Sequence, residues 1–206
     1  MLISTKEKNY AKVAAEHLRK GMPVVFPTET VYGIGASLEK EENIKRIVEL
    51  KGREVKKPIA IMCASLEKAK NYFEFGEEEL KIAKKFFPAP LTLLLKRKKT
   101  VPKWFYNDYE KIGLRIPNCK SALEILIEFG EILAVTSANI SGSEEAKTFE
   151  KALSYFGKYL DVLIVDGGRT KGIKPSTVAE IQEGGIKILR EGEISLRALK
   201  EALYEK

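Results

Sequence analysis

Apolar runs of strand length alternate with helical patterns along nearly the whole chain, and this alternation constrains the fold most strongly. Residues 41–51, for example, place Ile44, Ile47 and Val48 on one helical face. Helices are expected over residues 6–20, 41–51, 65–72, 77–87, 120–129, 148–157 and 195–205. Strands are expected over residues 23–27, 58–63, 90–98, 111–117, 131–137, 161–168, 176–182 and 186–192, with a short helical piece near 102–106. The alternation predicts an α/β fold on a mixed, mostly buried sheet.

The chain has the size and composition of one globular domain. Its 206 residues are 44% hydrophobic and 32% charged, without an internal repeat or a linker. We therefore expect a single domain over residues 1–206. No apolar run approaches the ~20 residues needed to cross a bilayer, and the charged N-terminus lacks the features of a signal peptide. These features predict a cytoplasmic protein.

Cysteine and histidine are scarce, which limits the possible chemistry. Cys63 and Cys119 are too few for a disulfide framework or a zinc site, and we expect both to pack as small apolar groups. The only histidine, His17, lies on a predicted helix, where we expect a surface or core-edge role. A hydrolytic triad would have to use it, so these counts argue against most nucleophilic hydrolases.

The common nucleotide-binding loops are missing from this sequence. It has no G-x-x-x-x-G-K-[ST], and Gly33-Ile34-Gly35 lacks the third glycine of a dinucleotide loop. If phosphate is bound, side chains must supply much of the positive charge.

The formal net charge is +7, and part of it is concentrated in one run. Residues 96–99 are all basic, and Lys103 is followed directly by Trp104, Phe105 and Tyr106. One interpretation is a solvated loop rim. The other is a patch that binds polyanions, with the aromatic rings stacking on bases.

Polar side chains follow several predicted strands and helices. In FPTETVYGIG, residues 26–35, a buried strand ends in three hydroxyl side chains and one carboxylate. Similar groups occur in four further regions: Lys51, Arg53, Lys56 and Lys57; Arg115; Thr136, Ser137 and Asn139; and Ser176, Thr177 and Arg190. Open α/β sheets present ligands at such ends. The set predicts a pocket for a ligand carrying both carboxylate and phosphate, but it does not identify the ligand.

Five motifs in order make the chain resemble the YrdC/YciO family over roughly residues 8–195. They are PTETVYGIGA, KGR at 51–53, SAN at 137–139, KPSTVAEI and ILREG. The resemblance implies a twisted mixed sheet flanked by helices, with a positively charged concave face. It also implies an L-threonylcarbamoyladenylate synthase, which makes threonylcarbamoyl-AMP and pyrophosphate from L-threonine, bicarbonate and ATP. A downstream threonylcarbamoyl-transferase complex would then modify adenosine in tRNA.

The resemblance also implies roles for individual residues. L-threonine would be bound by Thr30, Arg115, Val135 and Ser176. ATP would be bound by Arg53, Lys57, Lys111, Ser137, Asn139 and Arg190. Lys51 and Arg53 would be catalytic, and Tyr32 and the nearby glycines would shape the turn around threonine. An N-carboxylate of threonine would attack the α-phosphorus of ATP, with Mg²⁺ arriving on ATP, so no protein nucleophile is needed.

Several positions depart from the synthase pattern. Glu54 replaces a usual proline, Met62 stands where many synthases have histidine, and Glu145 replaces a small hydroxyl residue near ATP. PIAIMCASLE and EKIGLRIP are closer to the YciO branch, although Asn139 is kept. An alternative is therefore a YciO-like protein that binds tRNA or double-stranded RNA, with little synthase activity. A third is a related enzyme that uses an adenylate differently.

Some family members carry a regulatory second domain after a linker. This sequence ends soon after Arg190. We therefore expect the single-domain form.

Overall fold

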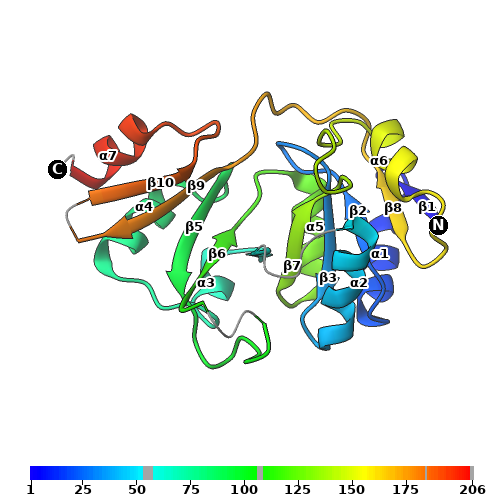
Figure 1. The fold of residues 1–206 in the computed structure, drawn as a ribbon, viewed down its shortest axis with the longest axis horizontal. Helices are drawn as coiled ribbons and strands as arrows, with labels where there is room; N and C mark the ends of the chain where they lie inside the picture. The colour runs from blue at the N-terminus through cyan, green and yellow to red at the C-terminus, as the bar shows by residue number, and fades with distance from the viewer. Residues whose placement is uncertain (53–57, 106–108, 184, 205–206) are drawn as a thin grey trace.

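The computed structural model describes residues 1–52, 58–105, 109–183 and 185–204. Ten strands and seven helices are present in this part of the chain (Figure 1). The strands are β1 (Leu2–Ser4), β2 (Val24–Phe26), β3 (Gly33–Ser37), β4 (Ala60–Met62), β5 (Leu91–Lys96), β6 (Lys111–Arg115), β7 (Leu133–Ser137), β8 (Leu163–Asp166), β9 (Thr177–Gln182) and β10 (Gly185–Arg190). The helices are α1 (Tyr10–Arg19), α2 (Glu41–Lys51), α3 (Leu66–Ala69), α4 (Glu77–Phe86), α5 (Lys120–Phe129), α6 (Phe149–Phe156) and α7 (Leu196–Tyr204).

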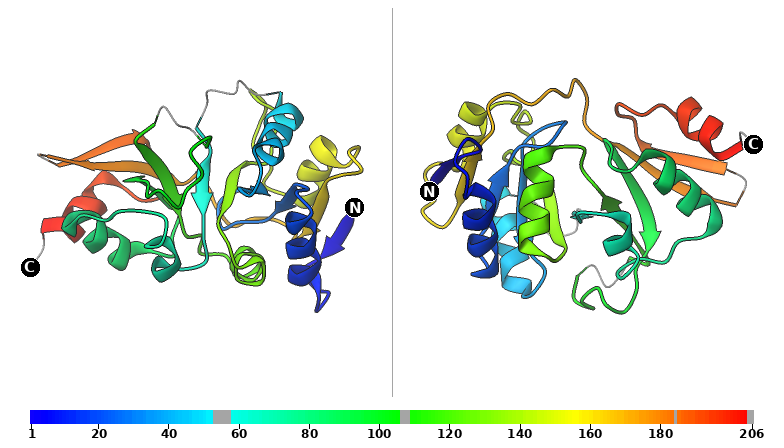
Figure 2. Two further views of the ribbon diagram at one scale, coloured as in Figure 1. Left: turned by 90° about the horizontal axis from the view of Figure 1, so that it is seen from below. Right: turned by 180° about the vertical axis from the view of Figure 1, so that it is seen from behind.

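All ten strands form one mixed sheet in the order β1-β8-β2-β3-β7-β4-β6-β5-β9-β10. Four neighbouring pairs are parallel, namely β1 with β8, β2 with β8, β4 with β6, and β5 with β9. Figures 1 and 2 show α1, α2, α5 and α6 around the half that holds β1, β8, β2, β3 and β7, and α4 and α7 beside β5, β9 and β10. The α/β class and the mixed sheet expected from the sequence are confirmed.

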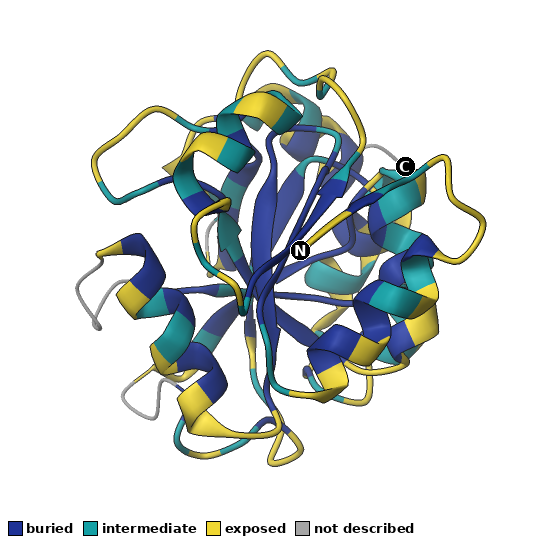
Figure 3. Cartoon of the chain, turned by 90° about the vertical axis from the view of Figure 1, so that its right-hand side faces the viewer, coloured by how far each residue is buried: buried dark blue, intermediate teal, exposed yellow. Residues whose placement is uncertain are grey.

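The apolar pattern of the strands explains how helices cover both faces of the sheet. Within β2, Val24 and Phe26 pack into the cluster that includes α1 and α5, while Val25 packs into the cluster on the other face. Alternate residues of a strand point to opposite faces, so a run that is apolar at every position needs cover on both sides. Figure 3 shows buried strands running between the surrounding helices.

Strand β4 joins the two halves of the sheet. It pairs antiparallel with β7 and parallel with β6, so that Met62 lies between Leu133 and Arg115. This junction brings the ends of β6 and β7 toward the turn that follows β2.

Two strands, β1 and β3, were not predicted. Expecting the glycines of the PTETVYGIGA motif to shape a turn was wrong, because Gly33 and Gly35 belong to β3, between β2 and β7. A Cβ at Gly33 would lie 2.9 Å from Val135 Cγ1, and one at Gly35 would lie 3.1 Å from Phe26 Cε1. The glycines thus make room for neighbouring side chains, and the turn itself spans residues 27–32.

Other boundaries agree closely with expectation. Helices α2 and α5 begin and end where the periodicity predicts, and Gly52 follows α2 at φ 57°, the left-handed conformation that glycine adopts without steric cost. Helix α1 begins at Tyr10, later than the expected residue 6. The helical piece expected near 102–106 is wrong over residues 102–105, where the chain forms a turn.

The lone histidine and the cysteines have structural roles. His17 is only 5% exposed, and its Nε2 lies 2.9 Å from the backbone oxygen of Asp161, so it belongs to the packing of α1. Cys63 is buried, Cys119 is half-buried, and both thiols are free. In the described part of the chain, no helix is both long and apolar enough to span a membrane.

Candidate active site

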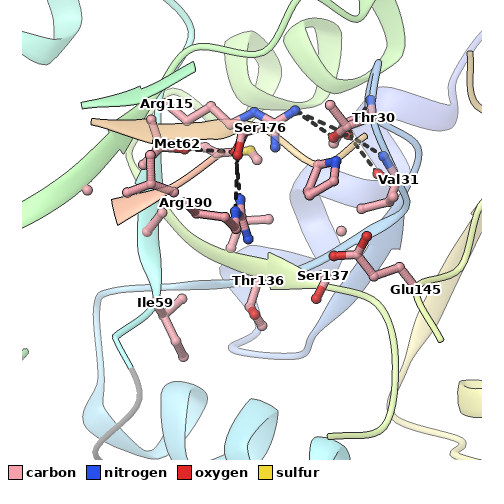
Figure 4. A pocket seen from close by; sticks show the side chains of 18 of the residues that line it. Thr30, Val31, Ile59, Met62, Arg115, Thr136, Ser137, Glu145, Ser176 and Arg190 are labelled. Atoms are coloured by element: carbon pink, nitrogen blue, oxygen red, sulfur yellow. Dashed lines mark hydrogen bonds between the residues drawn. The ribbon is translucent and has the colours of Figure 1, made fainter. Parts of the chain in front are cut away.

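A cavity of about 250 Å³ lies at the junction between the two halves of the sheet. Its walls come from the turn after β2, from β3, β4, β5, β6, β7, β9 and β10, and from the loops before α6 and β9. Figure 4 shows the side chains that point into it. Those used below are Thr28, Thr30, Met62, Thr92, Arg115, Val135, Ser137, Glu145, Ser176 and Arg190.

Arg115 supplies one buried positive charge. It is the last residue of β6 and is 7% exposed. Its Nη2 donates to Glu29 Oε1 at 2.9 Å and to Thr30 Oγ1 at 2.8 Å. Thr28 Oγ1 lies 3.0 Å from Thr30 Oγ1 and donates to the backbone oxygen of Val31 at 2.6 Å. The polar turn of the opening motif is therefore folded around this guanidinium.

Arg190 supplies the second charge, from the end of β10. Its Nη2 donates to Ser176 Oγ at 2.9 Å, and its Nε donates to Ser176 O at 3.1 Å. Ser176 Oγ also lies 3.1 Å from Thr92 Oγ1. Arg190 is exposed as a whole residue, but partial burial of its guanidinium lowers its pKa, while the nearby charge of Glu145 raises it and that of Arg115 lowers it. An arginine keeps its charge in proteins, so two cations and several hydroxyls converge here, an arrangement that favours an anionic, oxygen-rich ligand.

The SAN loop follows β7 and begins with the SAN motif at residues 137–139. Lys51 holds this loop from the side that faces away from the cavity. This lysine is 2% exposed, and its Nζ donates to the backbone oxygens of Ser137 and Asn139, the latter at 2.7 Å, and to Asn139 Oδ1 at 3.2 Å. Ser137 Oγ donates to Asn139 Oδ1 at 2.7 Å, and Asn139 Nδ2 donates to Ser143 O at 2.7 Å. These bonds give the loop a defined shape and leave Ser137 at the cavity wall.

The sequence-predicted residues fall into four groups. Thr30, Arg115, Val135, Ser137, Ser176 and Arg190 line the cavity together. Lys51 and Asn139 are buried behind the wall. Lys111 lines an adjacent cavity, where its Nζ lies 2.7 Å from Glu180 Oε1 and lowers the pKa of that carboxyl group. Arg53 and Lys57 lie outside the described residues.

The structure gives three residues long-range contacts that the sequence did not reveal. Glu29 pairs with Arg115 across 86 positions of sequence, and Thr92 contacts Ser176 across 84. Tyr32 is buried, and its hydroxyl donates to Gly168 O at 2.8 Å and accepts from Gly167 N at 3.0 Å. Burial raises the pKa of Tyr32 to about 12. For Glu29 and Tyr32, the advance signal was the crowding of polar residues after an apolar strand, and for Thr92 there was none.

The departures Met62 and Glu145 both line the cavity. Met62 is 4% exposed and offers a thioether in place of the imidazole that the family resemblance implies. The carboxylate of Glu145 faces the same space as Arg190 (Figure 4). The site therefore carries an acid beside its two cations.

Several side chains of the basic-aromatic stretch, residues 96–105 in the described part of the chain, pack against the core or bond to backbone oxygens. Phe105 is 1% exposed, so the prediction that it stacks on a base is wrong, and Trp104 packs against the same core. Arg97 Nη1 donates to the backbone oxygen of Phe105 at 3.0 Å, and Lys98 Nζ donates to that of Lys70 at 2.7 Å. Tyr106 lies outside the described residues.

A family model for Sua5, YciO and YrdC, described as telomere recombination, matches residues 16–192. The chain is 38% identical over 197 residues to the threonylcarbamoyl-AMP synthase of Pyrococcus abyssi, covering 94% of this chain and 57% of that protein. It is 33% identical over 194 residues to a putative threonylcarbamoyl-AMP synthase of Methanocaldococcus jannaschii, covering 94% and 91%. This chain thus spans little more than half the length of the Pyrococcus relative.

Two solved structures share the fold. Sua5 of P. abyssi, complexed with L-threonine, matches with a TM-score of 0.90 at 33% identity, over 100% of this chain and 61% of that one. YciO of E. coli matches with a TM-score of 0.85 at 26% identity, over 97% and 98%.

Proposed function

The chain belongs to the family of Sua5, YciO and YrdC, and on that basis we propose that it is an L-threonylcarbamoyladenylate synthase. It would combine L-threonine, bicarbonate and ATP into threonylcarbamoyl-AMP, releasing pyrophosphate. The observation that carries the proposal is the cavity in which Arg115 and Arg190 converge with the hydroxyls of Thr30 and Ser176. A relative with this fold is solved as a complex with L-threonine.

The amino acid would occupy the Arg115 side of the cavity. A planar guanidinium pairs well with a carboxylate, and Thr30 and Ser176 offer oxygens within the same space. Val135 and Met62 give this side apolar surface for the threonine methyl group. L-threonine carries a carboxylate, an amine, a hydroxyl and a methyl group, so each part of this wall has a partner.

The nucleotide would occupy the side formed by the SAN loop and Arg190. Ser137 lies at the wall, with Asn139 and Lys51 fixing its loop from behind. Lys111 would contribute from the adjacent cavity. Arg53 and Lys57 are proposed to contact the phosphates, with Arg53 catalytic. Mg²⁺ would arrive on ATP and neutralise phosphate charge.

The proposed reaction needs positioning and charge neutralisation. Threonine and bicarbonate form an N-carboxylate with loss of water, and an oxygen of that carboxylate attacks the α-phosphorus of ATP. The bond from the α-phosphorus to the bridging oxygen breaks, and pyrophosphate leaves. Arg115 and Arg190 would hold the reacting anions together, and the charge interactions of the buried Arg115 would be stronger than in water. The product would pass to a threonylcarbamoyl-transferase complex that modifies tRNA.

Isotope incorporation tests this proposal directly. Incubation with ATP, L-threonine and ¹³C-bicarbonate should give threonylcarbamoyl-AMP carrying the label, detected by mass spectrometry. Omission of any one substrate should abolish the product. ATP cleavage that gives no labelled adenylate would contradict the proposal.

A second candidate is an RNA-binding protein of the YciO type. Two observations favour it. Glu145 lies in the cavity, where it would repel the phosphates of ATP and so disfavour the synthase reaction. The match to YciO covers 97% of this chain and 98% of that one. Substitution of Lys98 and Lys99 by Ala should then weaken binding of tRNA or double-stranded RNA and flatten its salt dependence. Unchanged RNA binding in that variant would count against this candidate.

A further inference from the structure

One ion pair in the cavity wall is incomplete. Among residues 1–52, 58–105, 109–183 and 185–204, only two buried side-chain polar atoms lack a hydrogen-bond partner, Glu29 Oε2 and Arg115 Nε. Both belong to the pair in which Arg115 Nη2 donates to Glu29 Oε1 at 2.9 Å. Buried polar atoms are almost always paired in folded proteins, so two such atoms on one pair require an explanation.

The pair between Arg46 and Asp161 shows what the complete arrangement looks like. There, Nε donates to Oδ2 at 2.7 Å and Nη2 donates to Oδ1 at 3.0 Å, which is the two-bond geometry that arginine commonly forms with carboxylates. Arg115 and Glu29 make only the Nη2 bond. The two atoms without partners are the donor and the acceptor of the missing second bond.

Thr30 competes with Glu29 for the guanidinium. An arginine Nη nitrogen has two protons, and Arg115 Nη2 gives one to Glu29 and the other to Thr30 Oγ1 at 2.8 Å, with Thr28 Oγ1 at 3.5 Å. Nη1 has no hydrogen-bond partner within the described part of the chain. Arg115 lines the cavity. A ligand carboxylate in the cavity could therefore take the proton now given to Thr30, together with one from Nη1.

We propose that Glu29 is a positioning residue for Arg115, and that binding of a ligand carboxylate completes the Glu29–Arg115 pair. When the carboxylate replaces Thr30 as acceptor, the guanidinium turns, and Nε donates to Glu29 Oε2. Glu29 then holds one edge of the guanidinium, the carboxylate binds the other edge, and the Thr30 hydroxyl becomes available to the ligand. That the carboxylate is L-threonine's rests on the proposed function, whereas the incomplete pair does not.

The most direct test observes Arg115 itself. The ¹⁵N–¹H signal of Arg115 Nε, assigned by its loss in Arg115→Lys, should shift and exchange more slowly with solvent when L-threonine saturates the wild-type protein. The same titration of Glu29→Gln should give a clearly smaller shift. An Nε signal that stays unchanged while L-threonine binds the wild type would overturn the proposal. The wild-type titration tests the proposal even if Glu29→Gln does not fold.

Binding affinity supplies a second test with a matched control. By isothermal titration, Glu29→Gln should bind L-threonine roughly tenfold more weakly, the loss expected for one charge-assisted contact. L-threonine methyl ester, which has no carboxylate, should bind both proteins equally. Asp161→Asn, which removes the acid of the complete pair, should bind L-threonine like the wild type. Equal L-threonine affinity in Glu29→Gln and wild type would refute the positioning role.

The outcomes separate this inference from the proposed function. Glu29-dependent carboxylate binding without threonylcarbamoyl-AMP formation would keep the inference and reject the synthase. Synthase activity with an unchanged KM for L-threonine in Glu29→Gln would do the reverse. If the wild type binds none of L-threonine, L-serine and L-lactate, no carboxylate is available to complete the pair, and the inference is overturned.

Discussion

The two sides of the cavity are built in opposite ways. On the SAN side, Lys51 and Asn139 place their donors on loop carbonyls and amide oxygens, and neither side chain lines the cavity. On the opposite side, Arg115 lines the cavity, and two buried polar atoms of its pair with Glu29 lack partners. A wall whose hydrogen bonds are complete acts as a framework, whereas a wall with spare donors can accept a ligand. This difference predicts that a substitution on the SAN side will mainly lower stability, whereas one at Arg115 will mainly lower activity with L-threonine.

The largest effect is expected at Arg115. Arg115→Ala should lower kcat/KM for threonylcarbamoyl-AMP formation by roughly 10³-fold, or about 4 kcal/mol, because it removes the proposed partner of the ligand carboxylate. Initial rates at varied L-threonine measure this effect. Arg115→Lys keeps the charge and should recover only part of the rate. Full activity in Arg115→Ala would place the carboxylate elsewhere.

Substitution of Lys51 should affect stability more than L-threonine binding. Lys51→Met removes a buried ammonium that serves three acceptors in the SAN loop. We expect the free energy of unfolding to fall by about 2–3 kcal/mol, the scale of hydrogen bonds to a charged group. Urea denaturation measures the loss, and calorimetry should find L-threonine affinity unchanged. A variant of full stability that has lost ATP binding would instead make Lys51 a direct phosphate ligand.

Substitution of Glu145 tests whether its carboxylate weakens the binding of ATP. Glu145→Ser should lower the KM for ATP by about threefold to tenfold, since one negative charge near the phosphates is removed at an effective dielectric near 20. The gain should shrink at high salt, where charge interactions are screened. Steady-state kinetics at two ionic strengths would show this, with the KM for L-threonine as internal control. A higher KM for ATP would mean that Glu145 assists binding.

The smallest effect is expected at the ion pair between Arg46 and Asp161, which does not line the cavity. Its Asp161 is about one-third exposed, and the hydrogen bond from Arg46 lowers the pKa of the carboxyl group below its ordinary value of 3.8. A carboxyl pKa lowered by folding stabilises the protein above the unfolded value, and that stability is lost as pH falls through the folded value. Asp161→Asn should therefore cost about 0.5–1 kcal/mol near pH 7, and this difference from wild type should shrink as the pH falls below 3.8. Urea denaturation near pH 7 and at acidic pH checks the sign.

Local features of the fold could be predicted, because their causes lie within a few residues. Helix α2 and its closing Gly52 follow from apolar spacing and from the left-handed conformation that glycine allows. Strand β3 could not be predicted in this way, because its glycines are needed by Val135 and Phe26, which belong to neighbouring strands. Six residues singled out through the motifs line the cavity, namely Thr30, Arg115, Val135, Ser137, Ser176 and Arg190. That positional agreement leaves their chemical roles as proposals.

Contacts between distant segments were beyond sequence reasoning. Lys51 resembles any solvated lysine at the end of a helix until the SAN loop, 86 residues away, folds over it. Glu29 likewise gains its meaning only from Arg115. Such pairings are decided by the order of strands in the sheet, which periodicity and composition do not specify.

The central claim is that this cavity joins L-threonine, bicarbonate and ATP. Pyrophosphate release from ATP should be measured at room temperature and at a raised temperature, with each of the other two substrates present or omitted. The synthase predicts release that requires both L-threonine and bicarbonate and that is strongly reduced in Arg115→Ala. Release that is indifferent to L-threonine, or its absence from folded protein with all three substrates, would contradict the account.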